Sequence, residues 1–152
     1  MNIQDQYLQK VFQEDGSYRD LYITDVELKD WDGFLSLVRS SALQARLLKD
    51  GEEINIEDYR ACNIFAEKND HIFLLTIDFK GAIINCHFFN DNEIEFDVNP
   101  KELNSSAKRS AVIEFMQFMS NLNNKNVTLT PENLPGNPYL IVGSNGSITL
   151  LI

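Results

Sequence analysis

Clusters of basic side chains and long apolar runs are missing from this sequence, and histidine and cysteine are scarce. It contains 13 Lys and Arg residues, 2 His and 2 Cys, against 23 Asp and Glu residues. Nucleic acids and anionic membranes are bound through clustered lysine and arginine, so neither is an expected partner. Apolar stretches such as Ile72–Leu75 are too short to cross a bilayer, and the first residues lack the basic and apolar segments of a secretory signal. The expected location is the cytoplasm.

The two cysteines do not have the spacing of a metal site. Cys62 and Cys86 form no CxxC pair and have no histidine at the spacing of zinc ligands. We expect both to be small buried hydrophobic residues rather than ligands or disulfide partners. The glycine-rich nucleotide-binding motifs, GxSxG, HExxH and the EF-hand loop are also missing. The sequence therefore predicts no metal, no cofactor and no catalytic residues.

What the sequence does contain is an ordinary globular composition with a large excess of acid. Its 152 residues are 43% hydrophobic and 24% charged, and the net charge is −10. This length suits one domain over residues 1–152 with a single core, and no Pro/Gly/Ser-rich linker divides it. The charge is uneven, because residues 1–102 hold 21 acids and 10 bases, whereas residues 103–152 hold two acids and three bases. The acidity therefore belongs to particular segments of the first two thirds.

A β-meander is the best-defined part of the predicted fold. Residues 71–79 and 82–89 are rich in strand-forming residues, and the Lys-Gly dipeptide between them predicts a two-residue hairpin turn. Residues 93–98 alternate between acidic and apolar side chains after a three-residue loop. This register puts the apolar residues of all three strands on one face. A slip by one residue would bury the acids of the third strand, so the register is strongly favoured.

Two amphipathic helices are predicted on either side of the meander. Thr24 and Glu27 have the form of a capping box before a helix that ends near Ser40, and a second helix begins around Ser105 and is closed by two asparagines. A short helix after Asn55 is also expected. Further strands are expected at residues 18–24, 43–49, 127–130, 139–142 and 147–152. The predicted fold class is α+β, with a largely antiparallel sheet, a central β-meander and the two main helices on one face.

The opposite face of the meander carries the candidate site. The register sets Asn85 opposite Asp97 and His87 opposite Glu95, with Glu93 on the same face. Side chains two residues apart on a strand stand about 7 Å apart, which suits a row of basic groups on a protein partner better than one metal ion. A carboxylate beside a histidine can raise the pKa of the imidazole for general-base catalysis, so a small enzyme using His87 with Glu95 is an alternative. Plain solvation of the uncovered face is another.

Two further acidic groups are candidates for partner contact. Asp50, Glu52 and Glu53, followed by Glu57 and Asp58, are expected in a loop, where binding residues often lie. The acids between residues 14 and 32 surround the start of the first predicted helix, where the helix dipole favours them.

Three stretches resemble a group of small, mostly uncharacterised bacterial proteins. They are Gly16–Ile23 (GSYRDLYI), Gly81–Leu103 and Val127–Asn133 (VTLTPEN). In size, acidity and α+β outline the chain is also similar to the immunity proteins of contact-dependent inhibition and other polymorphic toxin systems. Those are small, cytoplasmic and commonly acidic domains that bind a cognate toxin domain, often a basic nuclease. The resemblance implies a binding protein and transfers no site residues.

We therefore expect a non-enzymatic protein that neutralises a basic toxin through its acidic surface. A tight complex with a toxin encoded by a neighbouring gene would follow. The alternative is a stand-alone interaction or regulatory domain of unknown partner, monomeric or homodimeric through its final hairpin. The expected contact residues are Glu93, Glu95, Asp97, His87 and Asn85, with Asp50, Glu52 and Glu53 as a second choice.

Overall fold

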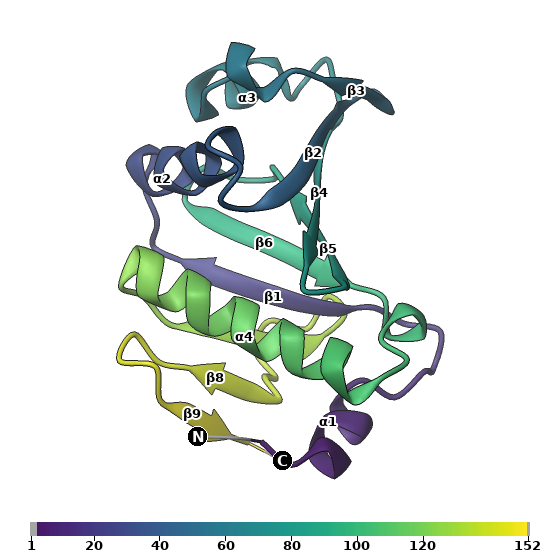
Figure 1. Cartoon of the computed structure of the whole chain (residues 1–152). Coiled ribbons are helices and arrows are strands. Elements are labelled where there is room, and N and C mark those ends of the chain that lie inside the picture. Colours follow the sequence, from purple (N-terminus) through teal and green to yellow (C-terminus); the bar gives the residue numbers. More distant parts are fainter. Residues whose placement is uncertain (1–2, 152) are drawn as a thin grey trace.

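The computed structural model describes residues 3–151 and shows an α+β fold built on one nine-stranded antiparallel sheet (Figure 1). The strands are β1 (Arg19–Thr24), β2 (Gln44–Lys49), β3 (Glu52–Ile54), β4 (Phe73–Phe79), β5 (Ala82–His87), β6 (Glu93–Val98), β7 (Val127–Pro131), β8 (Leu140–Val142) and β9 (Ile148–Leu150). Their order across the sheet is β3-β2-β4-β5-β6-β1-β7-β8-β9. The first strand of the chain thus lies in the middle of the sheet, between β6 and β7.

The helices gather on one side of this sheet, as predicted for the two main ones (Figure 1). Within residues 3–151, no helix is long and apolar enough to span a membrane. The α-helices are α1 (Asp5–Val11), α2 (Leu28–Arg39), α3 (Ala61–Glu67) and α4 (Ser106–Asn123), with single 3-10 turns at Ile56–Asp58 and Pro100–Glu102.

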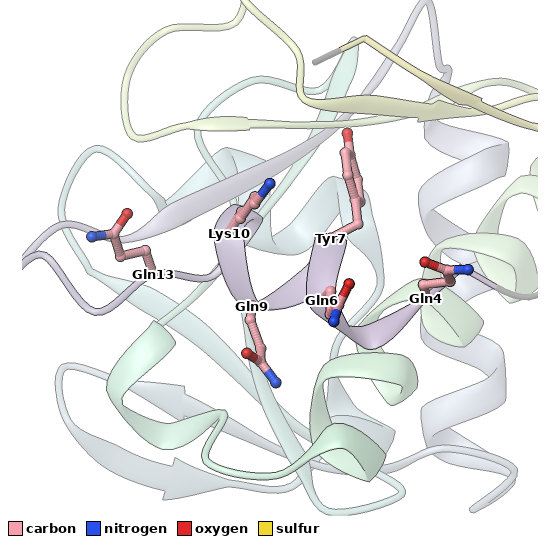
Figure 2. Close-up of a pocket in the computed structure, with 6 residues that line it drawn as sticks. All are labelled: Gln4, Gln6, Tyr7, Gln9, Lys10 and Gln13. Atoms are coloured by element: carbon pink, nitrogen blue, oxygen red, sulfur yellow. The ribbon is translucent and has the colours of Figure 1, made fainter.

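Helix α1 was not expected from the sequence, and it is fastened to α4 and to the sheet. The Asp5 carboxylate accepts two hydrogen bonds from the Arg109 guanidinium, each 2.9 Å long. The Tyr7 hydroxyl donates to the carbonyl of Tyr139 at 2.8 Å. The outer side of α1 borders a hollow lined by glutamines together with Tyr7 and Lys10 (Figure 2). Seven residues are too few to show a helical period in the sequence, so α1 depends on these distant partners.

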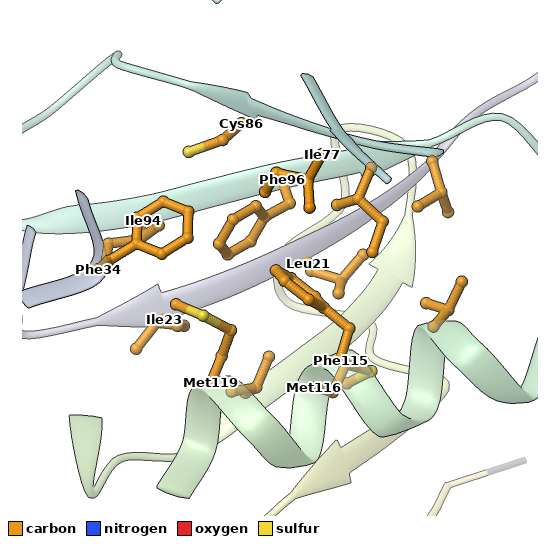
Figure 3. Close-up of a cluster of buried hydrophobic side chains, with 14 of the residues drawn as sticks. Leu21, Ile23, Phe34, Ile77, Cys86, Ile94, Phe96, Phe115, Met116 and Met119 are labelled. Atoms are coloured by element: carbon orange, nitrogen blue, oxygen red, sulfur yellow. The ribbon is translucent and has the colours of Figure 1, made fainter. Parts of the chain in front are cut away.

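The core lies between the sheet and the helices (Figure 3). Phe96 of β6 lies at its centre, where its ring meets Phe34 of α2 at 5.7 Å and Phe115 of α4 at 5.1 Å between centroids. Both contacts are edge-on, the geometry that aromatic pairs favour. One side chain therefore ties both main helices to the same sheet face.

The predicted meander register is confirmed. Phe79 pairs with Ala82 across the first turn, Leu75 pairs with Cys86, and Cys86 pairs with Phe96. Lys80 and Gly81 in the turn have φ angles of 53° and 91°. Positive φ at both central residues is the requirement of the tight hairpin turn that matches the twist of the strands.

Two local predictions are wrong. Helix α2 begins after Glu27 rather than after Thr24, because Thr24 still pairs in β1 and the next residue, Asp25, turns the chain with a φ of 58°. The Asp30 carboxylate then accepts the hydrogen bond of the Glu27 N–H at 2.8 Å. The acidic segment after Asp50, expected as a loop, instead forms the edge strand β3 and a 3-10 turn.

The cysteines differ from each other, against the prediction that both are buried. Cys86 is buried in the core, but Cys62 is exposed on α3. Helix α3 buries Ala61 and Ile64, which are three residues apart and share one face. Cys62 lies on the other side of that helix and contacts solvent.

Helix α4 ends at the asparagine pair, as predicted. The backbone conformation of Asn124 at this end can be tested by substitution. Asn124 is left-handed, with a φ of 53°, and its N–H donates to the carbonyl of Ser120. Glycine adopts this conformation without strain, so Asn124→Gly is expected to raise the free energy of unfolding by about 0.5 kcal/mol in urea denaturation. Asn123→Gly, inside the last helical turn, is the control and is expected to lower it. Equal effects of the two substitutions would contradict the assignment.

Candidate functional site

The sheet face that α2 and α4 leave uncovered carries the candidate site. Register aligns one residue of this face from every strand, and we call this line the His87 row. The prediction that His87 lies opposite Glu95 is confirmed within it. The row runs through Glu53, Leu48, Leu74, His87, Glu95, Tyr22, Thr128, Ile141 and Thr149.

A second line, the Asp97 row, lies beside the first on the same face. The predicted pairing of Asn85 with Asp97 is confirmed here. Asp97 is in turn opposite Asp20 of β1, so two carboxylates meet at the centre of the sheet. The row runs through Arg46, Thr76, Asn85, Asp97, Asp20 and Thr130.

Asp20 and Tyr22 are site residues that the sequence analysis did not place on this face. They enter it because β1 is inserted next to β6. Asp20 is only 4% exposed and Tyr22 7%. The Asn133 N–H donates to Asp20 Oδ2 at 2.8 Å, and the Tyr22 hydroxyl donates to the same oxygen at 3.0 Å. Asp20 is therefore the most deeply buried carboxylate of the face.

His87 pairs with Asp97 rather than with its cross-strand neighbour Glu95. His87 Nε2 lies 2.5 Å from Asp97 Oδ2. The other carboxylate oxygen of Asp97 accepts a hydrogen bond from the Asn85 amide at 3.2 Å, and Thr76 donates to the Asn85 carbonyl oxygen at 3.3 Å. The predicted general-base pair of His87 with Glu95 thus does not form as a hydrogen bond, since the diagonal neighbour holds the imidazole.

Glu95 is left without a hydrogen bond or an ion pair among residues 3–151. Its half-buried position raises the pKa of its carboxyl to about 7, and the neighbouring Asp20 and Glu93 carboxylates add to the rise. Partial burial also raises the pKa of Glu93. The hydrogen bond with Asp97 raises the pKa of His87. The face therefore holds protons more tightly than free side chains would.

The pKa of the Asp20 carboxyl is also raised. Burial raises the pKa of its carboxyl, and the negative charges of Asp97 and Glu132 act the same way. The hydrogen bonds from Asn133 and Tyr22 oppose this rise. Burial, followed by the negative charge of Asp20, raises the pKa of Tyr22, which stays a neutral donor. Excess negative charge is thus concentrated where β1 and β6 meet.

The second group of candidate residues is not one cluster. Glu53 lies on the uncovered face and forms an ion pair with Arg46 at 3.7 Å. Glu52 is opposite Lys49, and Lys49 pairs with Phe73, so Glu52 lies on the helix side of the sheet. Asp50 lies at the turn between β2 and β3, and its contacts are described below. The short strand β3 separates these acids, because successive side chains point to opposite faces.

The chemistry open to this face is that of carboxylates and one imidazole. Among residues 3–151, no group of three or more His, Cys, Asp or Glu side chains has the arrangement of a metal site. Four surface hollows lie beside α1, beside the turn before β1, at β2–β3 and at the end of α4. None of these four is lined by His87, Glu95, Asp97 or Asp20. The face is thus a broad acidic surface crossed by two rows of side chains.

Comparison with known proteins finds no matching family model, no matching curated protein and no matching solved structure. The function is accordingly inferred from the residues of this chain.

Proposed function

We propose that this protein is a non-enzymatic cytoplasmic binding protein that neutralises a basic protein, as an immunity protein neutralises its toxin. The observation that carries the proposal is the charge on the uncovered face. Glu93, Glu95 and Asp97 on β6 face the same way, with the buried Asp20 of β1 and the basic side chain of His87 beside them. Such a surface steers a basic partner to itself and sets the orientation of the complex.

A protein partner with several lysine or arginine side chains fits this face better than a small cation. Neighbouring strands are about 4.8 Å apart and same-face residues on a strand about 7 Å apart, so the carboxylates are spread over a surface. Among residues 3–151 Glu95 has no hydrogen bond or ion pair, and its carboxylate would be stabilised by an incoming guanidinium. The partner would supply positive charge beyond that of Arg46 and His87 on this face.

The alternative of a small enzyme loses the base pair from which it was argued. Its proposed base pair, His87 with Glu95, is replaced by the contact of His87 with Asp97. Asp97 is in turn held by Asn85, so the imidazole is fixed within the sheet surface. This arrangement orders the face for contact as well as it would orient a catalytic base.

A second candidate function is self-association through the edge of the sheet. Strand β9 ends the sheet on one side, and Leu150 and Leu151 beside it are exposed. An edge strand with apolar neighbours can pair with a second copy. Sedimentation velocity over a range of concentrations tests this candidate, and a monomer throughout would contradict it.

The main proposal predicts that the protein binds, and protects cells from, a basic toxin encoded beside its gene. Glu93→Lys and Glu95→Lys are each expected to weaken binding by roughly tenfold, because each replaces attraction by repulsion. Calorimetry of the complex and survival of toxin-expressing cells measure the effect.

The matched control is Glu114→Lys, which makes the same side-chain replacement on α4, on the helix side of the sheet. It is expected to leave binding unchanged. The proposal is wrong if Glu114→Lys weakens binding while the two β6 variants do not. It is also wrong if no neighbouring gene encodes a toxin and the protein protects no cell.

A further inference from the structure

Two large apolar side chains are exposed at one end of the acidic face. Ile72 is 77% exposed and Phe89 is 52% exposed. Leu74 of β4 pairs with His87 of β5. Ile72 comes two residues before Leu74 and Phe89 two residues after His87, so both flank this end of the strand pair. Single exposed apolar residues are common on protein surfaces, but adjacent ones form a patch that often marks an interface. We call Ile72, Leu74 and Phe89 the anchor patch.

Phe89 is held in place although it is exposed. Its ring stacks on the imidazole of His87, with 5.0 Å between centroids and 7° between planes. His87 is fixed in turn by its contact with Asp97. An aromatic side chain that is ordered before binding loses little conformational entropy when a partner covers it. The same contact that orders the acidic face therefore also orders the anchor patch.

Ile72 is held by Asp50, which the sequence analysis named among the second-choice contact residues. The Ile72 N–H donates to Asp50 Oδ1 at 2.9 Å, and His71 Nδ1 lies 2.6 Å from Asp50 Oδ2. The Asp50 N–H also donates to the carbonyl of Ile72 at 2.8 Å. The bonds to the carboxylate, the one from the Ile72 N–H first and then the one with His71, lower the pKa of the Asp50 carboxyl, so it is ionised at neutral pH. A carboxylate thus borders the anchor patch on the β2 side.

On the other side the anchor patch is bordered by the acids of β6. Glu95 is opposite His87, and Glu93, two residues earlier on β6, lies on the same face. The apolar centre is therefore flanked by negative charge on both sides. Interfaces gain most of their affinity from such a central apolar anchor inside a polar rim.

We infer that the partner docks through a basic segment in which an apolar side chain lies between arginine or lysine residues. The apolar side chain covers Phe89 and Ile72, and the cations contact Glu93 and Glu95 on one side and Asp50 on the other. This inference rests on the proposed function, because it assumes that the uncovered face meets a basic protein. It adds the chemical pattern of the segment that the partner presents.

Two synthetic arginine-rich peptides test the inference. They share all residues except the central one, which is leucine in one peptide and serine in the other. Titration of the full-length, isotopically labelled protein is followed by the amide NMR signals of Ile72, Phe89 and Glu95. The leucine peptide is expected to bind about tenfold more tightly than the serine peptide. Phe89→Ser is expected to remove this preference, so that the two peptides bind with equal affinity.

Leu122→Ser is the matched control, since Leu122 is an exposed apolar residue on α4, away from the acidic face. It is expected to keep the preference for leucine. If both peptides bind equally to the acidic face and Phe89→Ser has no effect, the inference is wrong while the proposed function stands. If neither peptide shifts the signals of this face, both are wrong. If the protein is a dimer that Phe89→Ser dissociates, the anchor patch binds a second copy and the inference is wrong.

Discussion

Replacing Arg19 by methionine is expected to lower the free energy of unfolding by about 3–5 kcal/mol, because it leaves buried hydrogen-bond acceptors without a donor. Arg19 is only 2% exposed because it lies on the core face of β1. Its Nε–H donates to the carbonyl of Val11 at 2.6 Å, and Nη2 donates to the carbonyl of Gln13 at 3.0 Å. Nη1 donates to Ser17 Oγ at 2.8 Å, and Asp15 completes the set with an ion pair at 3.3 Å. Methionine fills much of the same space but donates to none of these atoms.

Urea denaturation measures the loss, and hydrogen exchange of α1 locates it. The carbonyls of Val11 and Gln13 belong to the end of α1 and the residues after it, so exchange there is expected to rise most. The matched control is Arg46→Met, which removes an exposed ion pair worth less than about 1 kcal/mol. An Arg19 variant no less stable than the Arg46 variant would contradict the role given to Arg19.

The part of the fold that could be predicted from the sequence is the part held together by near neighbours. The register of β4, β5 and β6 follows from two short turns and from alternation, and a slip would bury Glu95 and Asp97. The same argument applies to α4, whose start at Ser105 and end at Asn124 are both marked by capping residues. In each case the deciding interaction spans only a few residues.

Helix α1 and the burial of Arg19 could not be predicted in this way. An arginine in a strand is expected at the surface. Arg19 is inside because α1 brings the carbonyl of Val11 over β1. Helix α1 in turn depends on the pairing of Asp5 with Arg109, which are 104 residues apart. No local pattern in either segment records this contact.

Only part of the candidate site could be predicted from the sequence, for the same reason. His87, Glu95 and Asp97 belong to the meander, so their common face follows from register. Asp20 and Tyr22 reach that face because β1 is inserted between β6 and β7, which is a non-local pairing. A strand that includes these residues was predicted, but its neighbours in the sheet were not.

The uncovered face should make the protein less stable as the pH rises from about 5 to about 8. The pKa of Glu95 is raised from 4.5 to about 7 in the folded protein, so the folded protein keeps a proton that the unfolded chain releases. The stabilisation from this proton is complete below pH 4.5 and is lost as the pH rises through about 7. Asp20, Glu93 and His87 have pKa values shifted in the same direction, so their contributions have the same sign.

Acids on other parts of the surface make the protein less stable at low pH. Hydrogen bonds lower the pKa values of Asp5, Asp15 and Asp50 below the ordinary 3.8. Their contributions are present above that value and are lost as the pH falls below it. The free energy of unfolding is therefore expected to be greatest near about pH 5 and to fall on both sides.

The free energy of unfolding is expected to fall between about pH 5 and about pH 8, and the partial exposure of Glu95 and His87 limits the loss. Urea denaturation at a series of pH values measures it. Glu95→Gln is expected to remove about 1–2 kcal/mol of this dependence, because glutamine has no proton to release. Glu52→Gln, at an exposed position on β3, is the control and is expected to keep the full dependence. Full dependence in the Glu95 variant would show that Glu95 is not the titrating group. A cation placed against Glu95 lowers the pKa of that carboxyl. When a basic partner binds this face near neutral pH, the Glu95 carboxyl is therefore expected to release its proton.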